Sequence, residues 1–191
     1  MGMYTGLRVK CIVKKEYRKD IDKLINTDDL EWKDLDDITF KAFAQINRSS
    51  MIPFGSLSYM PDEWEKPTGG KDKWGFDETI DTDGFDRFFN VDTGVLCFQC
   101  SLKNYESTIE IFLNIFLSKI CQKSYHIEKL YEEDGISTLY KIENGALQEL
   151  DCGIVYREYD DNNYWYEIKA PIISKDIKFC DFDFTYGGEI R

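Results

Sequence analysis

Two cysteines separated by two residues give the sequence its first pattern with the spacing of a reactive site. Cys97 and Cys100 form the only C-x-x-C motif in the chain, a spacing used by zinc sites and by redox pairs. The alternating run "GVLCFQCSLK" predicts a strand, and residues i and i+3 of a strand point to opposite faces. The two thiols therefore do not converge on one zinc ion, and we expect two buried, inert cysteines.

His126 is the only histidine of the chain, which excludes metal sites built from several histidines. Cys-His or Ser-His chemistry would depend on this one imidazole, yet no G-x-S-x-G motif or similar sequence marks a nucleophile. We therefore expect a partly exposed histidine on a strand and predict no catalytic residue.

Two further motifs resemble ligand loops but fail on spacing. In "DETIDTDGFD", placing Gly84 at position six of a calcium loop puts Thr79 at position one and Asn90 at position twelve, where Asp and Glu are required. In "PTGGKDK", a phosphate-binding loop would need glycine where Glu65 stands. We therefore predict neither a metal nor a cofactor.

Aromatic and acidic residues gather in the same stretch of the chain. Aromatic anchors with a charged rim are typical of protein-binding surfaces. The predicted interaction surface comprises Trp64, Trp74, Asp81, Asp83, Asp86 and Phe89, joined by Asp160 and Asp161 of a later hairpin. The alternative is that these aromatic rings cover a sheet face left open by the helices.

The elements that must position these residues follow from periodicity. Alternation predicts strands over 5–15 and 94–103, and the first has Arg8 and Lys10 on the face away from the core. Apolar spacing predicts helices over 16–25 and 104–120, and a short helix capped by Asp36 or Asp37 with Ile38 on its inner face. "DG" at 134–135 and "NG" at 144–145 predict hairpins, and another pair of strands flanks 160–163.

This order predicts an α+β fold, a ferredoxin-like sandwich with an antiparallel sheet and two main helices. We expect a domain over 1–150 with an insertion at about 50–91, and a β-hairpin extension over 151–191 packed on the same domain.

A short motif resembles a known group. "FQCSLKNYESTIEIFLNIF" followed by "HIEKLYEEDGISTLYKIENGALQE" resembles the ferredoxin-like domain of YubB-type proteins of phages and plasmids. The shared residues are Tyr131, Glu132, Glu133, Asn144 and Gly145, within a resemblance over about Asp92 to Gln148. Upstream, "DGFDRFFNVDTG" replaces the Trp-rich stretch of that group. The resemblance implies a fold and a mobile-element origin, and no reaction.

Composition limits the partners. The 191 residues carry a formal net charge of −12, which repels nucleic-acid phosphates and anionic membranes. With no apolar leader and no membrane span in the sequence, we expect a cytoplasmic protein.

We therefore expect a non-enzymatic interaction protein of phage or mobile-element origin that binds a basic or nucleic-acid-binding host protein, such as a defence factor. The alternative is a small-ligand or nucleotide-binding domain. A third hypothesis is an enzyme using Glu132 and Glu133. Exposed sheet edges also permit a homodimer.

Overall fold

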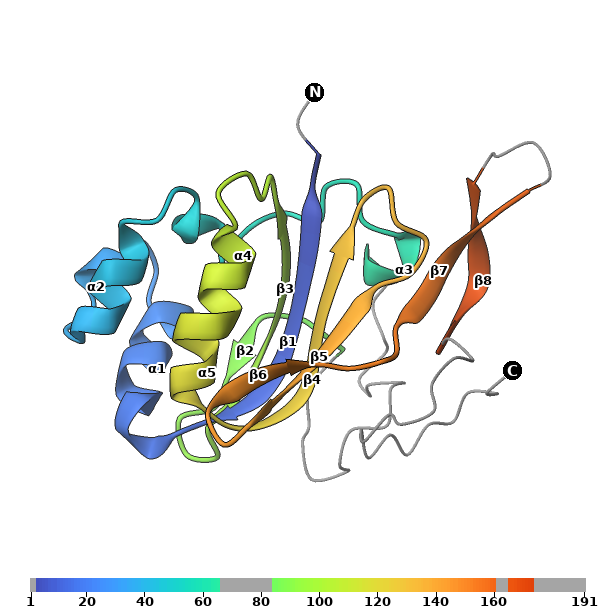
Figure 1. Cartoon of the computed structure of the whole chain (residues 1–191). Coiled ribbons are helices and arrows are strands. Elements are labelled where there is room, and N and C mark those ends of the chain that lie inside the picture. Colours follow the sequence, from blue (N-terminus) through green and yellow to red (C-terminus); the bar gives the residue numbers. More distant parts are fainter. Residues whose placement is uncertain (1–2, 66–83, 161–164, 174–191) are drawn as a thin grey trace.

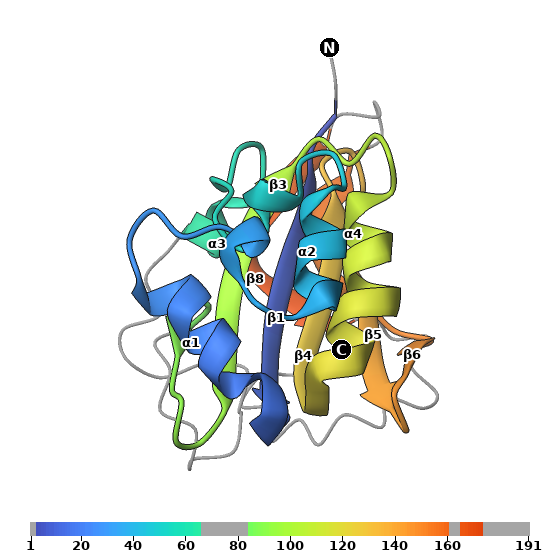
Figure 2. The same ribbon diagram turned by 90° about the vertical axis from the view of Figure 1, so that its left-hand side faces the viewer.

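A computed structural model describes residues 3–65, 84–160 and 165–173 of the chain. These residues form a layer of helices, a central sheet, and a second, smaller layer on the opposite face of that sheet (Figure 1). The helical layer faces the viewer in Figure 2, and the smaller layer of α3, β7 and β8 lies behind the sheet.

The strands are β1 (Thr5–Val13), β2 (Phe88–Phe89), β3 (Val95–Leu102), β4 (Cys121–Tyr131), β5 (Thr138–Glu143), β6 (Ala146–Glu149), β7 (Ile154–Tyr159) and β8 (Trp165–Ile173). The α-helices are α1 (Arg18–Asn26), α2 (Ile38–Ala44), α3 (Asp62–Glu65), α4 (Thr108–Ile111) and α5 (Ser118–Ile120). A π-helical segment, Phe112–Leu117, joins α4 to α5. Short 3₁₀ turns lie at Lys15–Tyr17, Trp32–Asp34 and Ser49–Met51.

The main sheet has six strands in the order β2-β3-β1-β4-β5-β6. Every pairing within it is antiparallel, and β1 lies at its centre between β3 and β4. The remaining strands, β7 and β8, form a separate two-stranded antiparallel sheet. The α+β class with an antiparallel sheet is thus confirmed.

The helices bury one face of the sheet. The predicted apolar stripe of the long helix is confirmed, since Ile109, Phe112, Leu113, Phe116, Leu117 and Ile120 are all buried in the larger of two core clusters. The helix begins at Thr108 with Ser107 at its N-cap position, later than the expected start at 104, and the Asn104 side chain accepts a hydrogen bond from the Ile109 backbone N–H at 2.9 Å. The sequence pattern did not reveal the π-helical turns in the middle of this stripe. The spacing of apolar residues indicates which face of a helix is buried, but it does not indicate which backbone groups form hydrogen bonds.

The short helix α2 begins where expected and packs on a different face. Asp37 is its N-cap and accepts a hydrogen bond from the Thr39 backbone N–H at 2.7 Å. Ile38, expected inside, is 80% exposed, and Phe40 and Phe43 are buried instead. The two aromatic rings pack against Trp32 and Phe116, and their larger apolar area determines which face turns inward.

The predicted hairpins are confirmed. A two-residue turn, Asn144 and Gly145, joins β5 to β6. The φ angles of these residues, 53° and 76°, are those of the turn type that two-residue hairpin loops favour. The "DG" residues lie in the longer connection between β4 and β5. Strands β7 and β8 pair on either side of the predicted third turn.

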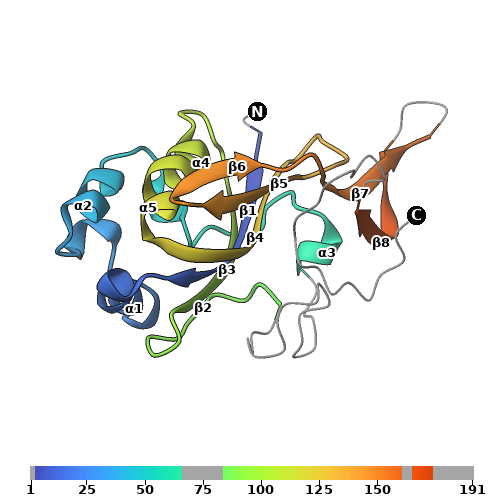
Figure 3. The same ribbon diagram turned by 60° about the horizontal axis from the view of Figure 1, so that its bottom comes forward.

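The opposite face of the sheet is covered as well, contrary to the prediction that β1 packs on one side only. Arg8 and Lys10, expected at a solvent-facing position, are 3% and 0% exposed. A second cluster covers them, and it joins α3 and β7 to the sheet through residues including Met60, Trp64, Leu130, Leu139, Ile154 and Tyr156. Figure 3 shows the sheet between the two layers.

Backbone hydrogen bonds attach β7 to the connection between β4 and β5. Ser137 N–H donates to the Ile154 carbonyl at 2.9 Å, and Tyr156 N–H donates to the Gly135 carbonyl at 2.8 Å. Strand β7 is therefore fixed to the main sheet by main-chain bonds as well as by apolar packing. Within the described residues, no helix has the length and apolar character needed to cross a membrane.

Candidate functional site

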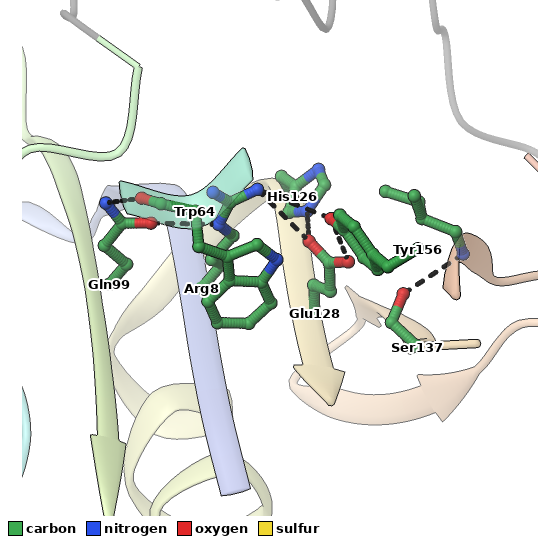
Figure 4. A network of polar contacts seen from close by, with 8 residues as sticks. Arg8, Trp64, Gln99, His126, Glu128, Ser137 and Tyr156 are labelled. Atoms are coloured by element: carbon green, nitrogen blue, oxygen red, sulfur yellow. Dashed lines mark hydrogen bonds and ion pairs between the residues drawn. The ribbon is translucent and has the colours of Figure 1, made fainter. Parts of the chain in front are cut away.

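Polar residues form a buried row across the three central strands. Arg8 of β1 stands opposite Gln99 of β3 and opposite Glu128 of β4. Because directly opposite residues of neighbouring strands have their side chains close together, the register alone brings these three groups together. All three point toward α3 and β7, away from the helical layer (Figure 4).

Glu128 is the centre of this network. Its Oε2 lies 2.8 Å from Nε2 of His126, and its Oε1 accepts a hydrogen bond from the Tyr156 hydroxyl at 2.7 Å. A third contact places Nη1 of Arg8 3.9 Å from Oε2. Burial favours the neutral form of Glu128, but its hydrogen bond to His126 and its electrostatic interactions with His126 and Arg8 hold its pKa below the ordinary value.

The Arg8 guanidinium is held by aromatic rings and by an amide. Its Cζ lies 4.3 Å from the ring centroid of Trp64 and 4.5 Å from that of Phe85, within range of a cation–π interaction. Its Nε donates to Oε1 of Gln99 at 3.0 Å, and Gln99 in turn donates from Nε2 to the Trp64 carbonyl at 2.9 Å. The network thus fixes α3 against the sheet.

This network is structural. His126 and Glu128 are 0% exposed and Tyr156 is 1% exposed, so the network offers no access to a substrate. Burial and the neighbouring Glu128 charge raise the pKa of Tyr156, which keeps its hydroxyl a hydrogen-bond donor. The prediction of a partly exposed His126 is wrong, because α3 and β7 cover a face that the sequence pattern left open.

The prediction that both cysteines of the motif are buried is confirmed. Cys97 and Cys100 are both 0% exposed and belong to different core clusters on opposite faces of β3. Burial raises the pKa of the Cys100 thiol far above its ordinary value, which makes it a poor nucleophile. Among the described residues, no group of three or more potential ligands is placed to hold a metal ion.

A cleft of about 690 Å³ lies at one end of the sheet, where β4 ends. It is bounded by the residues that follow β4, by the segment before α3, and by β7 and β8. Its lining residues are Tyr59, Met60, Tyr131, Glu132, Glu133, Asp134, Arg157 and Glu167.

Among the described residues that line this cleft, Arg157 is the one basic group. The side chain is 6% exposed, and its guanidinium donates to the carbonyls of Glu132 and Tyr59. Its Nη2 also lies 3.8 Å from Oε1 of Glu167. The backbone of Tyr59 is in the left-handed region with a φ of 63°, a conformation uncommon for a bulky residue. Its side chain is 67% exposed.

The other charged residues on the described lining are all acidic. Four carboxylates stand against the single guanidinium, which leaves an excess of three negative charges at full ionisation. Desolvation together with the charges of Glu133 and Glu132 raises the pKa of the Tyr131 hydroxyl, as expected where the local potential is negative. Oε2 of Glu132 is buried and has no hydrogen-bond partner among the described residues.

The predicted interaction surface changes in the structure. Trp64 and Phe89 are 1% and 4% exposed, so neither ring is an exposed anchor, and the alternative of aromatic rings covering the sheet applies to Trp64. Asp86 and Asp160 are exposed, but neither lines the cleft. Trp74, Asp81, Asp83 and Asp161 lie outside the described residues.

Comparison of this chain with protein-family models, with curated proteins and with solved structures found no match in any of the three.

Sequence reasoning singled out Glu132 and Glu133 without placing them in a cleft. Their neighbours there, Tyr59 and Arg157, are separated by 98 positions in the chain. No local pattern connects such distant residues. The one signal was the acidic run at 132–134 after an apolar strand, next to a "DG" turn.

Proposed function

We propose that this chain is a non-enzymatic interaction protein that binds a basic protein through its acidic, tyrosine-lined cleft. The observation that carries the proposal is the charge of that cleft, in which four carboxylates outnumber one guanidinium that is already hydrogen-bonded. Tyr59 is largely exposed at its edge, and tyrosine is enriched in protein-binding sites. The net charge of −12 attracts the same class of partner over a longer range.

The proposed origin is a phage or another mobile element, with a host protein as the target and a defence factor or other nucleic-acid-binding protein as the expected class. The resemblance to YubB-type domains supports the origin. The element order supports the ferredoxin-like interpretation, because helical segments separate β1 from β2 and β3 from β4, and β1 lies between β3 and β4. A homodimer through the sheet edge at β6 stays a prediction.

A small-ligand site is the second candidate, and the size of the cleft favours it. A volume of about 690 Å³ lies within the range of roughly 300–1,000 Å³ typical of ligand pockets. The acidic lining repels the phosphates of a nucleotide, so a ligand of this cleft would be cationic.

The test compares two variants of equal charge in a pull-down from lysate of the natural host at low and high salt. The cleft variant carries Glu132→Gln, Glu133→Gln and Asp134→Asn. The control carries Asp28→Asn, Asp92→Asn and Glu149→Gln at exposed positions outside the cleft and outside the interaction surface predicted from the sequence. Each loses three of the twelve excess negative charges, so both keep a net charge of −9.

We expect the wild type and the control to retain the same basic protein at low salt and to release it at high salt, while the cleft variant does not retain it. Equal retention by both variants would contradict the cleft as the binding surface. Retention of no basic protein, together with a co-purified cation, would favour the small-ligand alternative.

A further inference from the structure

We propose that the cleft accepts an arginine side chain of the partner in preference to a lysine. This inference rests on the proposed function and specifies the group that the cleft recognises. Its starting point is Oε2 of Glu132, a buried carboxylate oxygen without a hydrogen-bond partner among the described residues. Leaving such an atom unsatisfied is costly, and a donor from a bound partner removes that cost.

The wall of the cleft already holds one guanidinium. Arg157 is nearly buried there, and it contacts the carbonyls of Tyr59 and Glu132 and the carboxylate of Glu167. Carbonyl and carboxylate oxygens at this position thus match the flat, many-donor geometry of an arginine side chain. A second guanidinium that enters the cleft meets the carboxylates of Glu132, Glu133 and Asp134 on the lining. The Glu132 side chain is only partly buried, so a rotation of its carboxylate brings the unpaired oxygen to this guanidinium.

Two properties of the cleft distinguish guanidinium from ammonium. A carboxylate accepts two parallel hydrogen bonds from a guanidinium, whereas an ammonium acts as a compact point charge. Guanidinium also stacks on aromatic faces and is desolvated at lower cost, and Tyr59 and Tyr131 supply such faces on the lining. The acidic charge attracts any cation, and these two properties select arginine.

The experiment is a fluorescence anisotropy titration of the full chain with labelled nona-arginine and nona-lysine at low ionic strength. We expect nona-arginine to bind about tenfold or more tightly than nona-lysine. Glu132→Gln should reduce that preference to about twofold or less by weakening nona-arginine binding. The matched control Glu149→Gln, on exposed β6, should keep both affinities.

Glu133→Gln serves as a second variant, because its exposed side chain can be changed without disturbing the fold. It should weaken both peptides to a similar extent, and thermal melts of every variant verify that each is folded. If Glu132→Gln does not fold, a twofold or smaller preference in the wild type still overturns the inference.

The outcomes separate the inference from the proposed function. Equal affinity for both peptides, with loss of both in the Glu133→Gln variant, contradicts arginine preference and leaves a general cation-binding cleft. Failure of both peptides to bind the wild type contradicts the proposed function itself.

Discussion

Glu128 is the residue on which the buried network depends, because it alone accepts contacts from His126, Tyr156 and Arg8. Arg8 lies on β1, His126 on β4 and Tyr156 on β7, so their common acceptor joins these three strands. Removing its charge leaves Arg8 buried without the carboxylate that lies 3.9 Å from its guanidinium.

We predict that Glu128→Gln lowers the free energy of unfolding by about 3 kcal/mol, the usual cost of breaking a buried charge pair. Urea denaturation followed by circular dichroism measures this change. Glu143→Gln is the control, because its ion pair with Lys141 is at the surface and its side chain is 55% exposed; such pairs contribute little. Similar midpoints for the two variants would contradict a central role for Glu128.

The same carboxylate predicts how stability depends on pH. The folded state holds the pKa of Glu128 below its ordinary value, so its contribution is complete well above that value and is lost as pH falls through the folded-state pKa. The difference in unfolding free energy between wild type and Glu128→Gln should therefore shrink between pH 6 and about pH 3. Urea titrations at several pH values measure it, and a difference that stays constant or grows on acidification would be inconsistent with this account.

At the scale of elements, the second layer depends on the close approach of α3 to β1. Gly6 of β1 has no Cβ, and Trp64 and Met60 occupy the space where one would stand. This approach places the Trp64 ring over Arg8.

We predict that Gly6→Ala destabilises the fold by about 1–3 kcal/mol through overpacking, although alanine ordinarily suits a strand better than glycine. Adding Met60→Ala should recover part of the loss, because it removes one of the two groups in contact. A double-mutant cycle of unfolding free energies measures the coupling. Additive effects would show that the contact does not constrain the two elements.

The π-helical segment gives a second prediction at this scale. Phe116 is 1% exposed and contacts Trp32, Phe40 and Phe43, whereas its neighbour Ile115 is 63% exposed. Phe116→Ala should cost about 3–5 kcal/mol, and Ile115→Ala less than about 0.5 kcal/mol. Thermal melts compare them, and comparable losses would contradict the observed orientation of the segment.

Many of the helices, strands and hairpins are predictable from the sequence. The spacing of apolar residues and the residue types in the turns suffice to predict β1, β3, the long helical region and the hairpins, because those signals are local. They fail for the covered face of the sheet, since Arg8 and Lys10 alternate with apolar residues as solvent-facing groups do. Their burial depends on Trp64, Phe85 and Tyr156, which reach them only through tertiary packing.

The candidate site shows the same limit. Acidic composition and the run at 132–134 indicated negative surface charge, but the aromatic anchors chosen from the sequence, Trp64 and Phe89, are core residues. Aromatic residues near acidic ones look alike whether they face solvent or the core, because local sequence does not record which segment packs over them.

For the whole molecule, the second layer performs two tasks. On its inner side it closes the sheet over the Glu128 network. At one end of the sheet it borders the acidic cleft, to which Arg157 and Glu167 contribute from β7 and β8. The proposed binding surface therefore includes residues held on paired strands, which favours recognition with little rearrangement.

The central claim is that this cleft binds a basic protein segment, and hydrogen–deuterium exchange tests it most directly. The full chain is measured with and without a saturating basic peptide, either nona-arginine or nona-lysine. We predict slower exchange confined to segments 57–62, 131–137 and 154–158, and unchanged exchange around 26–48 on the helical layer. Protection of other surfaces alone, or no change in any segment, would contradict the account.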